Sequence, residues 1–411
     1  MSRLLFFLFL PTLALSAEPG VTVRQITQGP LHHFFGYIGH VGTIPWNASG
    51  RYIVALQTKH QDRMPEPGEA ADIVLIDTQN DNAVRVVEQT RAWNPQQGAM
   101  LYWNPQAAET QFFFNDRDPT THEVFCVLYD IAEKRRVTEL RHAKTPFGNS
   151  GVAQKGGWFL GINYARLARL RPVTGHPGAR DWTAGVQQPE DDGIFKVNVA
   201  TQETRLLVSF KQLADALRAT HPEVDGKDLF INHTLWNRDD DRIYFFVRGD
   251  FDKKEGRCNV PCVMNADGSE LRVLRDFIGG HPEWGNGHHM IGAADGRQVI
   301  YDTDAMEVAG TLGSPEIFPN PGGDVALSPD GRWLVNGHGE KGMNFYTILN
   351  LADKNWVRTP GFSQGGYSGD LRLDPGPLWN RDSTQLLVPG IADDAARTRQ
   401  LFIITVNRAA E

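Results

Sequence analysis

Two histidines and an aspartate occupy the same place in three successive repeats of a short apolar run. His233, His281 and Asp324 each lie three residues before the Trp or Leu that anchors such a run. The three anchors are Trp236, Trp284 and Leu327. Imidazole and carboxylate groups suit a divalent transition metal, and a histidine can alternatively act as a general base. Either chemistry requires that the fold bring these side chains together.

These residue types lead to a first assignment of roles. His281, Asp324 and His338 are the candidate ligands of a divalent metal such as Mn²⁺ or Zn²⁺, and His233 is the candidate base. In two earlier repeats, His33 and Gln97 stand near the equivalent place and are candidates for contact with a substrate. The alternative is a wet channel in which such groups bond only to water and backbone.

Three arginines within six residues form a second unusual pattern. Arg166, Arg169 and Arg171 require negative partners, and a guanidinium group binds a planar carboxylate through two parallel hydrogen bonds. One interpretation is a clamp for the carboxylates of a ligand. The other is a solvated loop whose arginines pair with nearby carboxylates such as Asp191 and Asp192.

Aromatic residues and a base complete the set that a uronide-degrading enzyme would need. Trp93, Trp182 and Tyr164 offer flat faces for sugar rings, although each can equally be a packed core residue. In β-elimination of a uronic-acid polysaccharide, a base removes the proton on the carbon next to the carboxylate. That proton becomes acidic enough only when a cation neutralises the carboxylate. We therefore expect His233 to be the base and either a metal or Arg169 to neutralise.

A repeated motif predicts the elements that position these residues. The stretch from Asp324 to Val335, DVALSPDGRWLV, has β-prone runs on both sides of a Ser-Pro-Asp-Gly turn, which is typical of a β-hairpin. The motif returns in weaker form at Trp46, Trp103, Trp236, Trp284 and Trp379. A return about every 45 to 60 residues, with further strand-like runs after each motif, indicates a β-propeller.

We expect an all-β fold, a seven-bladed β-propeller of four-stranded antiparallel blades. Val21 to Gln28 precedes the first repeat, so this N-terminal strand is expected to complete the last blade and close the ring. The innermost strands of a propeller line its channel, and residues just before them gather at one mouth. The best helical stretch is Lys211 to Thr220.

The start of the chain has the pattern of an export signal. Arg3 precedes an apolar run from Leu4 to Leu15 that is too short to span a membrane, and small residues follow as far as Ala17. We predict a signal peptide at 1–17, one β-propeller domain at 18–411, and a periplasmic or secreted location. The mature protein is expected to be a monomer that is not attached to a membrane. With 41 Lys and Arg against 49 Asp and Glu, the acidic chain is a poor candidate for a nucleic-acid partner.

Three cysteines in an oxidising compartment cannot all pair within one chain. Cys126 lies in the apolar run VFCVLYD and is expected to be a buried thiol, whereas Cys258 and Cys262 could close a small disulfide loop. The same pair could bind a metal, but it has no matching second pair.

Two groups of residues resemble known propeller families. The hexapeptide SPDGRW resembles the WD40-like repeat of the periplasmic TolB propeller. Asn232-His233 together with the segment GHPEW that contains His281 is similar to the oligogalacturonate lyase family of seven-bladed propellers. That resemblance implies a metal, usually Mn²⁺, held by three His and one Gln, while a separate His and an Arg perform the elimination. It places His233 as the catalytic His and His281 as the first metal ligand. Asp324 stands where a further His would be expected, and the Gln ligand has no clear counterpart.

These patterns support a leading hypothesis and two alternatives. The leading one is a secreted polysaccharide lyase-like enzyme that acts by β-elimination on an acidic, uronate-containing oligosaccharide. The first alternative is a non-catalytic periplasmic or extracellular propeller that binds such a sugar or another small ligand, in the manner of TolB. The second is a hydrolase built on the same channel, with Asp and Glu as acid and base.

Overall fold

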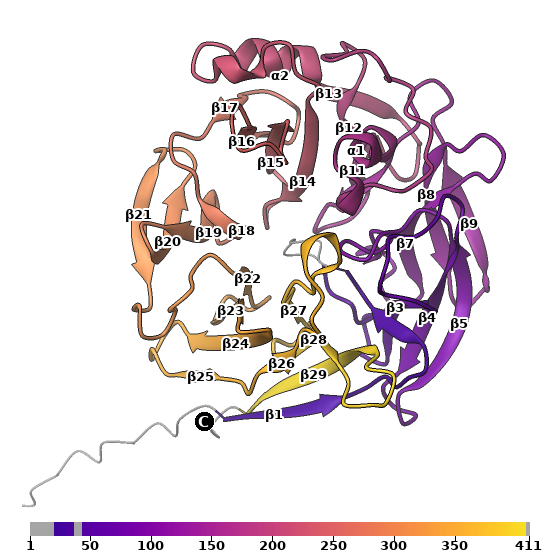
Figure 1. Cartoon of the computed structure of the whole chain (residues 1–411), viewed down its shortest axis with the longest axis vertical. Helices are drawn as coiled ribbons and strands as arrows, with labels where there is room; N and C mark the ends of the chain where they lie inside the picture. The colour runs from indigo at the N-terminus through magenta and orange to yellow at the C-terminus, as the bar shows by residue number, and fades with distance from the viewer. Residues whose placement is uncertain (1–19, 37–42, 408–411) are drawn as a thin grey trace, which may run out of the picture.

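The sheets of the protein are arranged around a central axis (Figure 1). The computed structural model describes residues 20–36 and 43–407. The predicted signal peptide, residues 1–17, lies outside the described residues. Within the described part of the chain, no helix is long and apolar enough to cross a membrane.

Five of the sheets are separate antiparallel blades of four strands each. The first contains β2 (His32–Phe34), β3 (Tyr52–Thr58), β4 (Ala71–Asp77) and β5 (Ala83–Thr90). The second contains β6 (Tyr102–Trp103), β7 (Gln111–Arg117), β8 (Val124–Asp130) and β9 (Arg135–Leu140). The third contains β10 (Gly148–Val152), β11 (Trp158–Ile162), β12 (Gly193–Asn198) and β13 (Thr204–Ser209). The fourth contains β14 (Phe230–Trp236), β15 (Arg242–Gly249), β16 (Cys258–Asn265) and β17 (Arg272–Val273). The fifth contains β27 (Leu378–Trp379), β28 (Gln385–Ile391), β29 (Arg399–Asn407) and β1 (Gly20–Gln25).

The remaining strands form one sheet of nine, so the prediction of seven four-stranded blades is wrong. Its first part contains β18 (Gly279–Trp284), β19 (His289–Ala294), β20 (Arg297–Asp302) and β21 (Glu307–Leu312). Its second part contains β22 (Asp324–Leu327), β23 (Trp333–Glu340), β24 (Met343–Asn350), β25 (Trp356–Arg358) and β26 (Phe362–Ser363). The inner strands β18 and β22 join the two parts through a parallel bridge between His281 and Asp324. The sequence repeat could not reveal this bridge, because it depends on how closely two inner strands approach at the axis.

Four of the recurring tryptophans each tie an inner strand to the part of the ring before it. The indole Nε1 of Trp236 donates to the carbonyl of Gly151 at 3.1 Å, and that of Trp284 donates to Leu235 at 2.9 Å. Trp103 and Trp379 make the same contact, with the carbonyls of Pro45 at 2.6 Å and Ala326 at 3.1 Å. Each indole also packs in the apolar core between sheets. The anchor therefore recurs because it supplies both packing and one inter-sheet hydrogen bond.

The turn that carries the strongest repeat forms a hairpin between β22 and β23. Gly331 has φ +70° and donates its backbone N–H to the carbonyl of Ser328 at 2.9 Å. The Ser328 hydroxyl oxygen accepts the N–H of Trp333 at 2.9 Å, and the Asp330 carboxylate accepts that of Arg332 at 3.0 Å. A β-carbon at Gly331 would be strained in this left-handed conformation.

The first and last strands complete one sheet together. β1 pairs antiparallel with β29 from Gly20 opposite Asn407 to Gln25 opposite Phe402, and the two lie side by side in Figure 1. The N-terminal strand therefore closes the ring and covers the edge of β29.

Two α-helices interrupt the strands. α2 (Phe210–Leu217) lies within one or three residues of the predicted bounds and begins at a capping box in which Ser209 and Gln212 bond reciprocally. α1 (Tyr164–Leu170) was not expected, and Asn163 caps it by accepting the N–H of Arg166. Three short 3₁₀ turns, η1 (Pro172–Thr174), η2 (Pro222–Val224) and η3 (Gly369–Leu371), complete the elements. α1 carries Arg166 and Arg169, and Arg171 follows it directly as the C-cap residue.

The cysteines form no disulfide. Cys126, Cys258 and Cys262 are all buried free thiols. The proposed loop between Cys258 and Cys262 does not form, because both residues lie on the extended strand β16. Four residues of strand span about 13 Å, which is about twice the Cα separation that a disulfide tolerates.

Candidate functional site

A cavity of about 260 Å³ opens where the inner strands begin, at one mouth of the central channel. Its polar lining includes Gln97, Arg171, His233, Arg248, His281 and Arg372. His233 and Arg248 come from the sheet of β14 and β15, and His281 comes from the nine-stranded sheet. The other three lie in segments between strands. The volume is sufficient for part of an oligosaccharide, and we call this cavity the central cleft.

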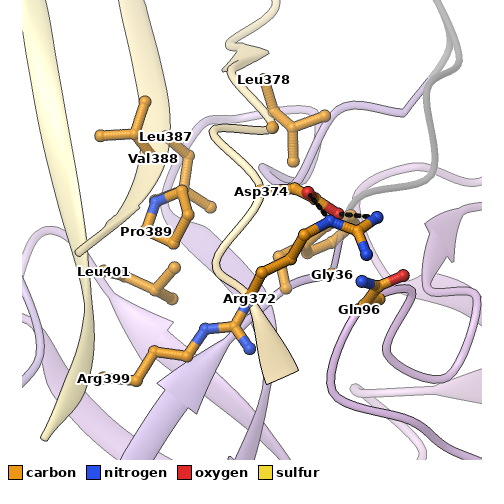
Figure 2. A pocket seen from close by; sticks show the side chains of 12 residues that line it. Gly36, Gln96, Arg372, Asp374, Leu378, Leu387, Val388, Pro389, Arg399 and Leu401 are labelled. Atoms are coloured by element: carbon orange, nitrogen blue, oxygen red, sulfur yellow. Dashed lines mark hydrogen bonds and ion pairs between the residues drawn. The ribbon is translucent and has the colours of Figure 1, made fainter. Parts of the chain in front are cut away.

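The second cavity near the axis is much smaller. It measures about 20 Å³, and Figure 2 shows it between apolar side chains of β28 and β29 and the polar groups of Gln96, Arg372 and Asp374. These three polar residues also line the central cleft. Because 20 Å³ holds about one water molecule, this small pocket cannot hold a sugar.

His233 enters the cleft from a distorted part of β14. Asn232 pairs with Phe246 and Leu235 pairs with Tyr244, so the strand bulges between them. His233 itself has φ +59°, a conformation that costs a non-glycine residue about 1–2 kcal/mol. Its ring centroid lies 5.3 Å from that of His281. The equal offset in the repeats therefore does bring the two imidazoles together, and the backbone is strained where it does so.

His281 is held by a buried carboxylate. Its Nδ1 pairs with Oδ1 of Asp324, whose Oδ2 accepts the backbone N–H of Gly376 at 2.8 Å. Burial opposes the charged form of His281, but the nearby carboxylates of Asp324 and Asp374 outweigh it and raise the pKa of the imidazole. Both oxygens of Asp324 are therefore committed to partners within the protein.

The three predicted metal ligands do not form a metal-binding group among the described residues. His338 is buried on β23, where its ring stacks on Phe345 with centroids 5.8 Å apart, and burial lowers its pKa. Among the described residues, no three His, Cys, Asp or Glu side chains form a group that could hold a metal. The donors His281 and Asp324 bind each other instead. The residues present therefore do not fit the metal centre predicted from His281, Asp324 and His338.

Two buried arginines face the cleft beside His233. Arg248, on β15, donates from Nε to the side-chain oxygen of Asn259 at 2.8 Å, and its side chain is nearly enclosed. Burial, together with the nearby charge of Arg171, lowers the pKa of Arg248 to about 9. Arg171 follows α1 and donates from Nη1 to Asp252 at 2.8 Å, while its buried Nε has no hydrogen-bond partner.

A third guanidinium comes from the segment before β27. Arg372 forks onto Asp374, with Nε–Oδ1 at 2.8 Å and Nη2–Oδ2 at 3.3 Å (Figure 2). With its side-chain oxygen on the Arg372 side, Gln96 accepts from Nη1 at 2.7 Å and from Nη2 at 3.1 Å. Burial and the neighbouring Asp324 raise the pKa of Asp374. Arg372 and Asp374 therefore contribute a fixed ion pair to the cleft wall.

Of the three clustered arginines, only Arg171 lines the cleft. Arg166 is 1% exposed and donates to the carbonyls of Leu229, Val186 and Gln187 at 2.6, 2.9 and 2.5 Å. Arg169 pairs with Asp181 and Asp228, at 2.8 and 2.9 Å. Local partners thus occupy Arg166 and Arg169, but both residues lie on α1 and not in a solvated loop. Of the two carboxylates named from the sequence, Asp192 is near enough for its charge to act on Arg166.

The other predicted contact residues divide between the cleft and the core. Gln97 lines the cleft and donates to the Asn232 side chain at 3.3 Å. His33 is buried between Gln400 and Gln57, with ring nitrogens 2.9 and 2.8 Å from their amides. The aromatic candidates are held elsewhere. Trp93 is buried and bonds to the carbonyl of Glu69, Tyr164 is buried and stacks on His176, and Trp182 bonds to the carbonyl of Pro146.

Three charged cleft residues were missed by reasoning from the sequence. Arg248 directly follows the apolar residues 243–247 of β15, where its charge was a usable signal. Arg372 and Asp374 lie in an irregular glycine-rich segment with no motif, so nothing in the sequence placed them at the axis.

The fold resembles that of solved propellers. A structure described as oligogalacturonate lyase in complex with manganese is 14% identical, covers 95% of both chains and has a TM-score of 0.62. TolB from Acinetobacter baumannii is 12% identical over 88% of this chain and 82% of its own, with a TM-score of 0.41. The β-propeller domain of the trilobed protease from Pyrococcus furiosus is 11% identical over 88% and 95%, with a TM-score of 0.48. No protein-family model and no curated protein matches the sequence. At such identities the likeness to the lyase concerns the fold alone.

Proposed function

We propose that this protein is a periplasmic or secreted lyase-like enzyme that cleaves an acidic, uronate-containing oligosaccharide by β-elimination. The observation that supports it best is one cleft in which the His233 imidazole lies with the guanidinium groups of Arg171, Arg248 and Arg372. A base and a neutralising cation are the two groups that the reaction requires.

The chemistry can be assigned to residues of the cleft. A guanidinium group binds the uronate carboxylate and stabilises the negative charge that develops on it when the adjacent carbon loses its proton. His233 accepts that proton, a double bond forms in the uronate ring, and the bond to the neighbouring sugar's oxygen breaks. The departing oxygen must gain a proton, which water or a cleft side chain can supply. We assign the neutralising role to Arg171 and Arg248, which line the cleft. Arg372 is already forked onto Asp374. Arg169 does not line the cleft and pairs with Asp181 and Asp228.

The metal does not enter this mechanism. The manganese belongs to the structurally similar lyase, whereas the candidate donors His281 and Asp324 in this chain are bonded to one another. The side chains of the cleft, with water, supply every group that the steps above require.

The second candidate is a propeller that binds such a sugar without cleaving it. It is favoured by the lining itself, because buried arginines suffice to hold an acidic ligand and require no base. In either case the partner is a small acidic ligand rather than nucleic acid or a membrane, and we propose a monomer.

Turnover of uronides distinguishes the two candidates. Mixing the protein with a panel of oligouronides should raise the ultraviolet absorbance of an unsaturated uronate product. His233→Ala should lower the rate by about 100-fold or more while leaving the fold intact, since general-base groups contribute about that much. The matched control is His289→Ala, which removes an imidazole on β19 that is 43% exposed and does not line the cleft. A flat trace with every uronide would favour the binding protein, and an unimpaired His233→Ala variant would remove His233 from the mechanism.

A further inference from the structure

Arg171 and Arg248 form a pair of like charges at the cleft, with Arg248 buried and the side chain of Arg171 13% exposed. Their Cζ atoms lie 4.5 and 4.4 Å from the centroid of the same ring, that of Phe251. Arg248 is 9% exposed, and the positive charge of Arg171 adds to the burial that disfavours its charged form. Two neighbouring guanidinium groups repel each other, and removal from water increases the repulsion.

Within the described residues, no carboxylate lies at ion-pair distance from Arg248. Its hydrogen-bond partner is the neutral side chain of Asn259. The carboxylate that pairs with Arg171 belongs to Asp252, whose side chain is 71% exposed and therefore well hydrated. Asp374, the carboxylate that lines the cleft, is forked onto Arg372. The protein thus leaves the positive charge of this pair largely uncompensated.

Such an arrangement is costly for the empty protein. An unpaired buried charge destabilises the folded protein, and charged groups held in this way cluster at functional sites. The buried Nε of Arg171 has no hydrogen-bond partner in the protein, so a donor also remains to be satisfied. An anion between the two guanidinium groups would accept these donors and cancel the repulsion.

The groups that could recruit a divalent cation to the same cleft are already bonded. His281 pairs with Asp324, Asp324 also accepts from Gly376, and Asp374 pairs with Arg372. The positive charge in the cleft is therefore built into the chain as guanidinium groups.

We propose that Arg171 and Arg248 form an anion site that holds a sugar carboxylate without a metal ion. The carboxylate is planar, and each guanidinium can donate two parallel hydrogen bonds to it. The identification of the anion as a uronate rests on the proposed function. Metal independence distinguishes this cleft from that of the manganese-bound lyase whose fold it resembles.

The test is calorimetric binding of trigalacturonate to a His233→Ala parent, in which turnover cannot interfere. The affinity should be the same, to within roughly twofold, in EDTA and in MnCl₂. Maltotriose, a neutral sugar of equal length, should not bind. Arg248→Gln and Arg171→Gln, each made in that parent, should weaken binding about tenfold or more, as expected for a hydrogen-bonded charge.

The matched control is Arg257→Gln. Arg257 also lies over the Phe251 ring, at 5.1 Å, but it is exposed and does not line the cleft. Its variant should bind as the parent does. The inference is overturned if the parent binds no trigalacturonate, if binding requires MnCl₂, or if both cleft variants bind normally.

Failure of the anion site and failure of the proposed lyase activity give different results. Binding in EDTA without any unsaturated product from the wild type would support the anion site and contradict the lyase. Turnover by the wild type, together with binding that requires MnCl₂, would support the lyase and overturn the anion site.

Discussion

Arg166 and Arg171 show how differently two neighbouring arginines are used. Arg166 lies in α1 and is almost fully buried, and its guanidinium holds three backbone carbonyls, including that of Leu229 just before β14. Arg171 follows the same helix and reaches the cleft. The composition of the cluster correctly indicated a need for negative partners. Only the helical geometry decided that one arginine would meet carbonyls and another a cavity.

Asp192 extends the network around Arg166. It is fully buried and accepts hydrogen bonds from Asn163 at 2.9 Å and Thr183 at 3.2 Å. Burial raises its pKa from 3.8 to about 6, although the Asn163 hydrogen bond and the charge of Arg166 oppose the shift. The folded state therefore binds the Asp192 proton more tightly than the unfolded state does.

The free energy of unfolding should consequently fall with pH in this range. Below about 3.8 both states are protonated, and between that pH and about 6 the unfolded state loses its proton first. Stability present at the acidic end is lost as the pH rises to about 6, by on the order of 3 kcal/mol. In urea unfolding at successive pH values, Asp192→Asn should become less destabilised relative to the wild type up to about pH 6. A constant difference between wild type and variant across this range would contradict the assignment.

At the scale of elements, the bulge in β14 determines where His233 points. A regular strand would pair every residue of β14 with β15 and keep strict alternation of side chains. The register shift between Asn232 and Leu235 breaks that alternation, and His233 takes the left-handed conformation. The bulge therefore determines both the position of the His233 imidazole and the backbone strain at this residue.

This strain can be measured with two substitutions. His233→Gly and His233→Ala both remove the imidazole, but glycine adopts positive φ without a steric penalty. We expect the Gly variant to be more stable than the Ala variant by about 1 kcal/mol, the reverse of the usual order in a strand. Urea unfolding of both proteins would measure the difference. An Ala variant at least as stable as the Gly variant would show that the bulge stores no strain.

In the whole molecule, two kinds of contact hold the ring together: contacts between neighbouring sheets, and the pairing of β1 with β29 that closes the ring. The indole donors of Trp103, Trp236, Trp284 and Trp379 each join an inner strand to the preceding inner region. The parallel bridge between His281 and Asp324 joins two further inner strands. The same pair lies at the cleft, so closure at the axis and assembly of the site are connected.

Closure by β1 predicts a marked effect of truncation. A chain that begins at Ile26 loses β1 and leaves the edge of β29 unpaired, whereas a control chain that begins at Gly20 keeps the whole strand. We expect the shorter chain to lose on the order of 3 kcal/mol, because several backbone hydrogen bonds of about 1 kcal/mol each disappear. It should also aggregate, since an exposed strand edge pairs with other chains. Thermal unfolding and light scattering would measure both effects, and equal behaviour of the two chains would show that β1 does not secure the ring.

The sequence by itself determined the propeller class, the repeated tryptophan anchors, the Ser-Pro-Asp-Gly hairpin and α2. It also determined that His233 and His281 would meet. These features depend on the residues of each turn, on the spacing of apolar residues and on equal offsets within a repeat. All three are visible in the order of the residues along the chain.

Tertiary structure decided the rest. It joined β18 to β22 in a nine-stranded sheet and paired His281 with Asp324. It also stacked the His338 ring on Phe345. Arg248, Arg372 and Asp374 came to line the cleft. Such outcomes depend on distances between segments that are far apart in the chain and on which charges lose their water. Neither quantity can be read from the order of the residues.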